Sequence, residues 1–140
     1  MMKAKILIVE DEPAIQELLA FNVMQAGFQA LRADDGESAW EQIRGAIPDM
    51  ILLDWMLPNT SGVVLAKQFR ENARTKDIPI IMFCTLTVDT EATVDALTRG
   101  ANDYVPKPTV SGHINDAVTY LKSTVIPKLK RWGRWFQGLR

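Results

Sequence analysis

The sequence predicts an α/β fold, a doubly wound (βα)5 five-stranded parallel sheet with helices on both of its faces. Three observations predict it. Short apolar runs alternate with stretches whose apolar residues recur at helical spacing. The run at residues 50–53 is apolar without a break, which is typical of a strand buried on both faces. Charged residues directly follow several of these runs, and open α/β sheets place their functional residues at the carboxyl ends of strands.

Five strands alternate with five helices along the chain. The strands are expected at residues 5–9, 28–33, 50–54, 78–84 and 103–105. The apolar faces of the helices are expected within residues 15–24, 39–43, 63–69, 92–97 and 114–125. Pro13 suits the first turn of the first helix, while Gly27 and Gly100 end the first and fourth helices. Connections between parallel strands are right-handed, so the helices cover both faces of the sheet.

Size and composition are those of one globular domain. The chain has 140 residues, of which 47% are hydrophobic and 24% charged, and its net charge is −1. Its one cysteine, Cys84, excludes an internal disulfide and suits a reducing compartment. The first apolar run stops at acidic residues 10–12, unlike a signal peptide, and no run approaches the roughly 20 apolar residues of a membrane span. We therefore expect a cytoplasmic protein.

Charged residues at the ends of three predicted strands converge on one edge of the sheet. Glu10 and Asp11 follow the first strand, Asp54 ends the third, and Lys107 follows the fifth. If the first and third strands are neighbours, three carboxylates come together, and like charges this close need a counter-ion. A hard divalent cation such as Mg²⁺ prefers oxygen ligands and meets that need. The sequence thus predicts a magnesium site beside a lysine.

This constellation resembles the receiver domain of two-component response regulators, the CheY-like family with a flavodoxin-like fold. The resemblance runs from about residue 3 to residue 125 and is carried by Val9–Glu12, Leu52–Pro58 with Gly62, Gly100–Tyr104 and Lys107–Pro108. The same stretch also resembles the receiver half of chemotaxis methylesterases, in which a helical linker follows. We accordingly divide the chain into a receiver domain at residues 1–126 and a basic, aromatic helical tail at residues 127–140, with the two parts forming one signalling protein.

The resemblance implies that Asp54 accepts a phosphoryl group from the phosphohistidine of a sensor histidine kinase or phosphotransfer protein. Asp11, Asp54 and the backbone carbonyl of Met56 would hold Mg²⁺, and Glu10 would assist through water. The metal and Lys107 would stabilise charge on the transferring oxygens. Such a protein is a phosphorelay switch that catalyses its own phosphorylation and dephosphorylation, and it is not an enzyme acting on a separate substrate. The Lys107–Pro108 peptide bond is expected to be cis, as in the family.

The resemblance also implies a hydroxyl at the end of the fourth strand and an aromatic switch residue. Counting from residue 78 assigns the hydroxyl position to Cys84, whereas counting back from Lys107 favours Thr85. We prefer Thr85, because a thiol is a weak hydrogen-bond donor. Tyr104 matches the aromatic residue that moves inward on activation. The residue two after the acceptor, Met56, cannot orient an attacking water, so we expect a comparatively long-lived phosphorylated state.

Charge divides the chain unevenly between body and tail. Residues 123–140 contain five basic residues and no acid, whereas the other residues contain 11 basic and 17 acidic residues, a balance of −6. Beyond Pro127, which interrupts the fifth helix or starts a new one, the residues on one helical face are Leu129, Trp132, Trp135, Phe136 and Leu139. We rank a homodimer or effector contact through the fifth helix and tail first, packing on the tail's own domain second, and membrane contact last. A charge of +5 without a recognition fold argues against a nucleic-acid partner.

A different class of function is also open. A pseudo-receiver that never takes phosphate and binds partners constitutively is favoured by the displaced hydroxyl position, and the intact Glu10, Asp11, Asp54 and Lys107 argue against it. A haloacid-dehalogenase-like phosphatase needs a second Asp two residues after the nucleophile. Met56 occupies that place, so this alternative fails.

Overall fold

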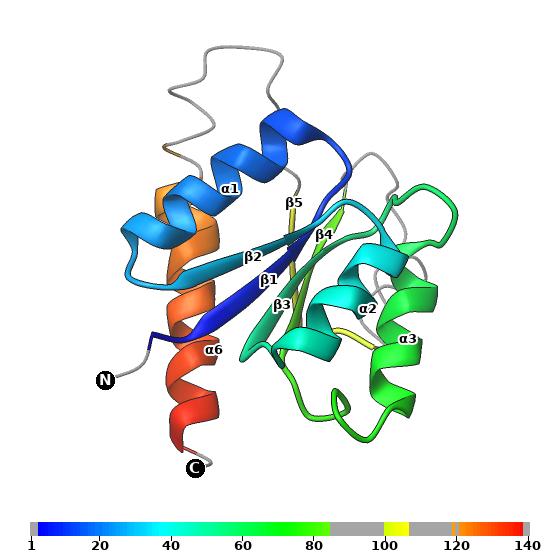
Figure 1. Ribbon diagram of the computed structural model, residues 1–140. Coiled ribbons are helices and arrows are strands. Elements are labelled where there is room, and N and C mark those ends of the chain that lie inside the picture. The colour runs from blue at the N-terminus through cyan, green and yellow to red at the C-terminus, as the bar shows by residue number, and fades with distance from the viewer. Residues whose placement is uncertain (1–2, 85–99, 107–118, 120, 139–140) are drawn as a thin grey trace.

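A five-stranded parallel sheet forms the centre of the molecule in the computed structural model (Figure 1). The structure describes residues 3–84, 100–106, 119 and 121–138. The strand order is β2-β1-β3-β4-β5, so the first and third strands are neighbours. The strands are β1 (Lys5–Val9), β2 (Gln29–Ala33), β3 (Met50–Asp54), β4 (Ile80–Cys84) and β5 (Asp103–Pro106). The predicted doubly wound fold is confirmed, with β2 starting one residue and β4 two residues later than expected.

Local chemistry starts each of the first three helices. α1 (Pro13–Gln25) begins with a proline, whose missing N–H costs nothing in a first turn. α2 (Gly36–Gly45) is capped by Asp35, whose side chain accepts from the Ser38 N–H at 2.8 Å. α3 (Gly62–Glu71) is capped in the same way by Ser61, which accepts from the Val64 N–H at 3.2 Å. These three helices match the predicted ones in order and place.

Two buried clusters, one on each face of the sheet, make up the core. On one face, α1 and the C-terminal helix pack against residues that include Ile6, Ile8, Met50, Leu52 and Ile81. On the other, α2 and α3 pack against residues that include Leu7, Val9, Ile51, Leu53 and Met82. The odd and even positions of β1 and β3 thus face opposite layers, as the two-residue period of a strand requires. β3 is buried along its whole length, as predicted for a central strand.

The C-terminal part of the chain packs on its own domain. A π-helical turn, η1 (Leu121–Val125), leads into α6 (Ile126–Gly138), which lies on the same face of the sheet as α1 (Figure 1). Leu129 is fully buried there, and the half-buried Trp132 packs against the same cluster. Of the alternatives for the tail, packing on its own domain is therefore the one observed for these two residues. The division of the chain at residue 126 stays a prediction.

Pro127 lies in the first turn of α6, where a proline is tolerated. The irregular π-helical turn comes directly before it, which is where a helix that meets a proline has to adjust its hydrogen bonding. Pro127 was expected either to interrupt a helix or to start a new one. The π-helical turn matches the first expectation, and the start of α6 matches the second. The predicted helix at 92–97 and residues 114–118 of the predicted fifth helix lie outside the described residues.

The buried face of α1 differs from the predicted one. Met24 was expected on the apolar face, but 60% of it is exposed, whereas Gln16 and Asn22 are buried. The buried stripe therefore mixes polar and apolar side chains, and the polar ones carry hydrogen bonds that a hydrophobic pattern does not reveal.

Among the described helices, none is long and apolar enough to cross a membrane.

Arg70 of α3 fixes the start of β5 against the start of β4. Its guanidinium donates to the carbonyl of Gly100 at 2.9 Å, to that of Ile78 at 2.7 Å, and to the side chain of Asn102. Asn102 in turn accepts from the Ile80 N–H at 2.8 Å. Burial lowers the pKa of Arg70, and the negative charge of Asp77 opposes that shift. These bonds set the register of the strand that leads to residue 107.

Candidate functional site

The register of the sheet brings Glu10 and Asp54 together at its carboxyl edge. Val9 pairs with Leu53, so the next residue of each strand lies at the same height on adjacent strands. Alternation along the strands assigns both residues to the α1 face, the side on which Ile8 and Leu52 are buried. Asp11 follows directly, and one oxygen from each of the three carboxylates lies within 4.8 Å of the other two. The predicted convergence of the three acids is confirmed.

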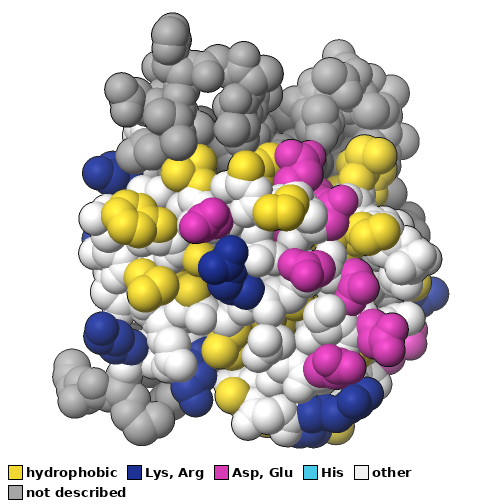
Figure 2. All heavy atoms as spheres, turned by 45° about the horizontal axis from the view of Figure 1, so that its top comes forward, with side chains coloured by type: hydrophobic (Ala, Val, Ile, Leu, Met, Phe, Trp, Pro, Cys, Tyr) yellow, Lys and Arg dark blue, Asp and Glu magenta, His cyan; other side chains and the backbone are white. Residues whose placement is uncertain are grey.

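The three carboxylates differ in their exposure to solvent. Glu10 is fully buried and Asp54 is 1% exposed, whereas Asp11 is exposed. Figure 2, with the top of Figure 1 turned forward, shows Asp and Glu side chains gathered on one part of the surface. Two buried acids beside a third are costly unless a positive charge joins them. An all-oxygen donor set with one side open to solvent fits a hard divalent cation that keeps some of its waters.

The segment after β3 folds back and holds the Asp54 carboxylate. The Met56 N–H donates to Asp54 Oδ1 at 3.1 Å, which fixes one oxygen of the carboxylate. The Gly62 N–H donates to the carbonyl of Trp55 at 2.8 Å and closes the loop. Asn59 adopts a φ of 70°, the left-handed conformation that asparagine tolerates better than most residues. The Met56 side chain is 65% exposed and points away from the core.

Gly62 allows α3 to start directly against the backbone of Asp54. A Cβ built at Gly62 would lie 2.3 Å from the Asp54 carbonyl oxygen and 2.8 Å from the Trp55 Cα. Both are backbone atoms, so no side-chain rotation relieves the contact. This is a close approach that only glycine permits. The family motif contains Gly62, and the structure supplies its physical reason.

Gln16 holds the loop that carries the acid pair, and sequence reasoning missed it. Its Nε2 lies 2.8 Å from the Glu10 carbonyl oxygen and 3.0 Å from that of Ala33. The Glu10 N–H donates to the same Ala33 carbonyl at 3.0 Å. The available signal was spacing, because Gln16 lies four and seven residues before the buried Ala20 and Val23. A polar residue in a core-facing phase is a candidate for a structural or functional hydrogen bond.

The remaining predicted site residues are described only in part. Cys84 ends β4 and pairs with Pro106 of β5, and Tyr104 of β5 pairs with Met82 of β4. Thr85 and the Lys107–Pro108 bond lie outside the described residues. Of the predicted site residues, the described part of the structure thus brings together Glu10, Asp11 and Asp54.

For the other predicted site groups, the assigned roles stay predictions. These groups are Cys84, Thr85, Tyr104, Lys107 and the backbone carbonyl of Met56.

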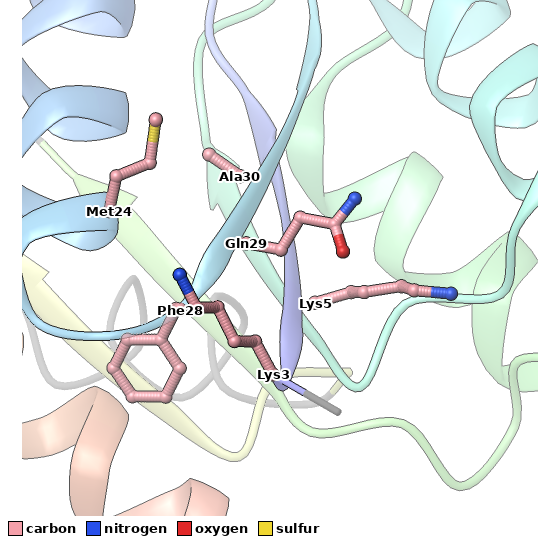
Figure 3. A pocket seen from close by; sticks show the side chains of 6 residues that line it. All are labelled: Lys3, Lys5, Met24, Phe28, Gln29 and Ala30. Atoms are coloured by element: carbon pink, nitrogen blue, oxygen red, sulfur yellow. The ribbon is translucent and has the colours of Figure 1, made fainter. Parts of the chain in front are cut away.

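A hollow at the opposite edge of the sheet contains none of these acids. Figure 3 shows the side chains that line it where α1 ends and β2 begins: Lys3, Lys5, Met24, Phe28, Gln29 and Ala30. The hollow lies at the amino ends of β1 and β2. It is therefore separate from the acidic cluster at their carboxyl ends.

A parallel five-stranded sheet with an acidic cluster at its carboxyl edge is the arrangement expected of a receiver domain, and comparisons with known proteins agree. The family model described as "Response regulator receiver domain" matches residues 6–119. The chain belongs to this family. Receiver domains bind Mg²⁺ at an acidic pocket, and Glu10, Asp11 and Asp54 form an acidic cluster here.

Among curated relatives, the "Phosphate regulon transcriptional regulatory protein PhoB" of Escherichia coli is 44% identical over 107 residues, which are 76% of this chain and 46% of that protein. The "Protein-glutamate methylesterase/protein-glutamine glutaminase" of Trichodesmium erythraeum is 34% identical over 93% of this chain and 37% of its own length. The chain thus spans less than half the length of these relatives.

Solved structures agree on the fold. A "putative response regulator" from Chloroflexus aurantiacus superposes with a TM-score of 0.70 at 33% sequence identity, covering 87% of this chain and 97% of its own.

Proposed function

We propose that the protein is a phosphorylation switch in which Asp54 is the phosphoacceptor. A carboxylate oxygen of Asp54 attacks the phosphorus of a phosphohistidine, the phosphorus–nitrogen bond breaks, and the imidazole leaves with the bonding electron pair. The product is an acyl phosphate on Asp54. The observation that carries the proposal is the cluster of three carboxylates, two of them buried, in which one oxygen from each lies within 4.8 Å of the others.

The chain's own residues prepare Asp54 for this step. The Met56 N–H fixes one carboxylate oxygen at 3.1 Å, so the other oxygen is oriented as the nucleophile. Glu10, Asp11, Asp54 and the backbone carbonyl of Met56 would hold Mg²⁺. When bound, this ion would supply positive charge that stabilises the negative charge of the transferring phosphoryl group. Lys107, which follows β5 in the sequence, would add a second positive charge.

Thr85 is our choice over Cys84 for the hydroxyl that binds the new phosphoryl group. Ile81 of β4 belongs to the same buried cluster as Leu52, the residue two before Asp54. Alternation along β4 assigns odd-numbered positions to that face, which favours residue 85. Tyr104 then senses the occupied hydroxyl position and changes the binding face of the domain. Exchange of Thr85 for Ala should uncouple phosphorylation from partner binding.

The partners follow from this chemistry. The phosphoryl donor is a sensor histidine kinase or a phosphotransfer protein, and the output is a contact made by the phosphorylated face with an effector or a second copy of the chain. Some relatives have names that refer to DNA or transcription, such as the "DNA-binding dual master transcriptional regulator RpaA" of Synechocystis, of which this chain covers 43%. Residues 1–126 are the receiver, and we assign no nucleic-acid contact to them.

The second candidate function is a pseudo-receiver that binds partners without phosphate, favoured by the displaced hydroxyl position. Intact mass after incubation with Mg²⁺ and acetyl phosphate separates the two functions. A phosphoryl-sized gain in wild type that is absent in Asp54→Asn supports the switch. No gain in a folded protein supports the pseudo-receiver.

A further inference from the structure

Gln16 lies at the junction of the acid-pair loop, α1 and the end of β2. Gln16 is 6% exposed, and its amide contacts groups from two other segments of the chain, Glu10 and residues 32–34. Nε2 lies 2.8 Å from the Glu10 carbonyl, 3.0 Å from the Ala33 carbonyl and 2.9 Å from Asp34 Oδ1. Oε1 accepts from Arg32 Nε at 2.9 Å. Both ends of the buried amide are thus engaged.

The orientation of this amide is dictated by its partners. Arg32 can only donate, so it must meet the oxygen of the Gln16 amide. Two carbonyls and a carboxylate can only accept, so they must meet its nitrogen. Flipping the amide would set like against like at every contact. The side chain is therefore held in one pose by Arg32 on one side and by the Glu10 and Ala33 carbonyls on the other.

Gln16 anchors the backbone from which the metal-binding carboxylates project. Glu10 is the first residue after β1, and its N–H and carbonyl both take part in the same group of bonds through Ala33 and Gln16. The Glu12 N–H returns to Glu10 Oε1 at 3.1 Å. Asp11, between them, is exposed. Without the anchor, repulsion among three carboxylates would push this short loop away from Asp54.

Gln16 does this without adding charge. A cationic side chain at this place would hold the same carbonyls but would also neutralise part of the negative potential that attracts a cation. A neutral amide holds the carbonyls and leaves the negative potential of the carboxylates unchanged.

We propose that Gln16, locked by Arg32, is the positioning residue that preorganises the Glu10–Asp11 pair for Mg²⁺. The inference rests on the proposed function, because it concerns the same cation.

The test is the dissociation constant for Mg²⁺, followed by the fluorescence of Trp55, which directly follows Asp54 and is half-buried. The same titration on the Trp55→Phe variant measures the fluorescence change of the other tryptophans, which is then subtracted. Loss of a residue that orients metal ligands typically weakens metal binding 10- to 100-fold. Gln16→Met, which keeps the length and loses the bonds, should raise the dissociation constant about tenfold or more.

Two further variants separate positioning from general effects. Asn22→Ala is the matched control, because Asn22 is a buried amide on the same helix that donates to the Leu18 carbonyl at 2.8 Å. It should lower stability and leave Mg²⁺ affinity unchanged. Gln16→Glu adds a negative charge but cannot donate when ionised. Positioning predicts weaker binding in this variant, whereas a simple charge effect predicts tighter binding.

Each outcome decides between the accounts. Weaker Mg²⁺ binding in both Gln16 variants, with Asn22→Ala at the wild-type value, supports the proposal. Wild-type affinity in Gln16→Met, tighter binding in Gln16→Glu, or equal weakening in Asn22→Ala overturns it and leaves the phosphoacceptor proposal intact. If the wild-type protein does not bind Mg²⁺ at all, both proposals fail.

Discussion

Replacing Gly62 with alanine tests how closely α3 must approach the phosphoacceptor. The added Cβ would lie 2.3 Å from the Asp54 carbonyl oxygen, 2.8 Å from the Trp55 Cα and 3.0 Å from the Asp54 carbonyl carbon. An ordinary van der Waals contact begins near 3.4 Å, so the start of α3 and the end of β3 must separate by about 1 Å. The same movement stretches the bond from the Gly62 N–H to the Trp55 carbonyl, now 2.8 Å.

Two effects of known size follow from that movement. Overpacking of this kind costs about 1–3 kcal/mol of the free energy of unfolding. A misplacement of about 1 Å at a reacting group can cost about 100-fold in rate. We therefore expect Gly62→Ala to remain folded, with reduced stability, and to take phosphate from acetyl phosphate far more slowly than wild type.

Gly36→Ala is the matched control, because Gly36 is also the first residue of a helix. A Cβ there would meet only side-chain atoms, the nearest being Leu65 Cδ1 at 3.5 Å. Urea unfolding and the rate of mass gain are measured on both variants. Equal phosphorylation rates for Gly62→Ala and wild type would show that the close approach does not position Asp54, and the reasoning would be wrong.

Three further predictions concern the lifetime of the switch and the stability of the fold. Met56→Asn, which places an amide able to orient water at an exposed position beside the acceptor, should shorten the lifetime of the acyl phosphate severalfold, and an unchanged decay of the phosphorylated mass would remove the idea. Leu129→Ala should lower the free energy of unfolding by about 2–5 kcal/mol because Leu129 is fully buried, whereas the exposed Lys130→Ala should change little in the same urea titration. Asp35→Ala removes a helix cap and should cost about 1 kcal/mol at pH 7. Bonds from Ser38 lower the pKa of Asp35, so this stabilisation is present above the carboxyl's ordinary pKa and is lost as the pH falls through the lowered value. Unfolding curves of Asp35→Ala and wild type should therefore converge in acid, and a constant difference down to low pH would contradict the assignment.

The fold and the acid cluster were predictable because their causes are local in sequence. β3 is buried on both faces, and its unbroken apolar run states this directly. Glu10, Asp11 and Asp54 each stand at or just after a strand end, and parallel strands align those ends at one edge. Once the fold was known, the convergence of the three acids followed from topology alone.

Other features were not predictable because their causes lie between segments. The spacing of Gln16 marks it as core-facing, but only the fold shows what its amide contacts, because β2 brings the Ala33 carbonyl and Arg32 beside it. Met24 continues the apolar spacing of α1 but is 60% exposed, whereas the neighbouring Val23 is fully buried. The apolar spacing that includes Leu129 is the same whether the helix packs on its own domain or on a partner. Only the position of α6 on the sheet decides that question.

The central claim is that Asp54 itself takes the phosphoryl group, and locating that group is its most direct test. The protein is incubated with acetyl phosphate and Mg²⁺, the acyl phosphate is reduced with borohydride to homoserine, and tandem mass spectrometry identifies the residue. We expect homoserine at residue 54, dependent on Mg²⁺ and absent from the Asp54→Asn variant. A label on Asp11 or on any other residue, or no label in a folded protein that binds Mg²⁺, would contradict the account.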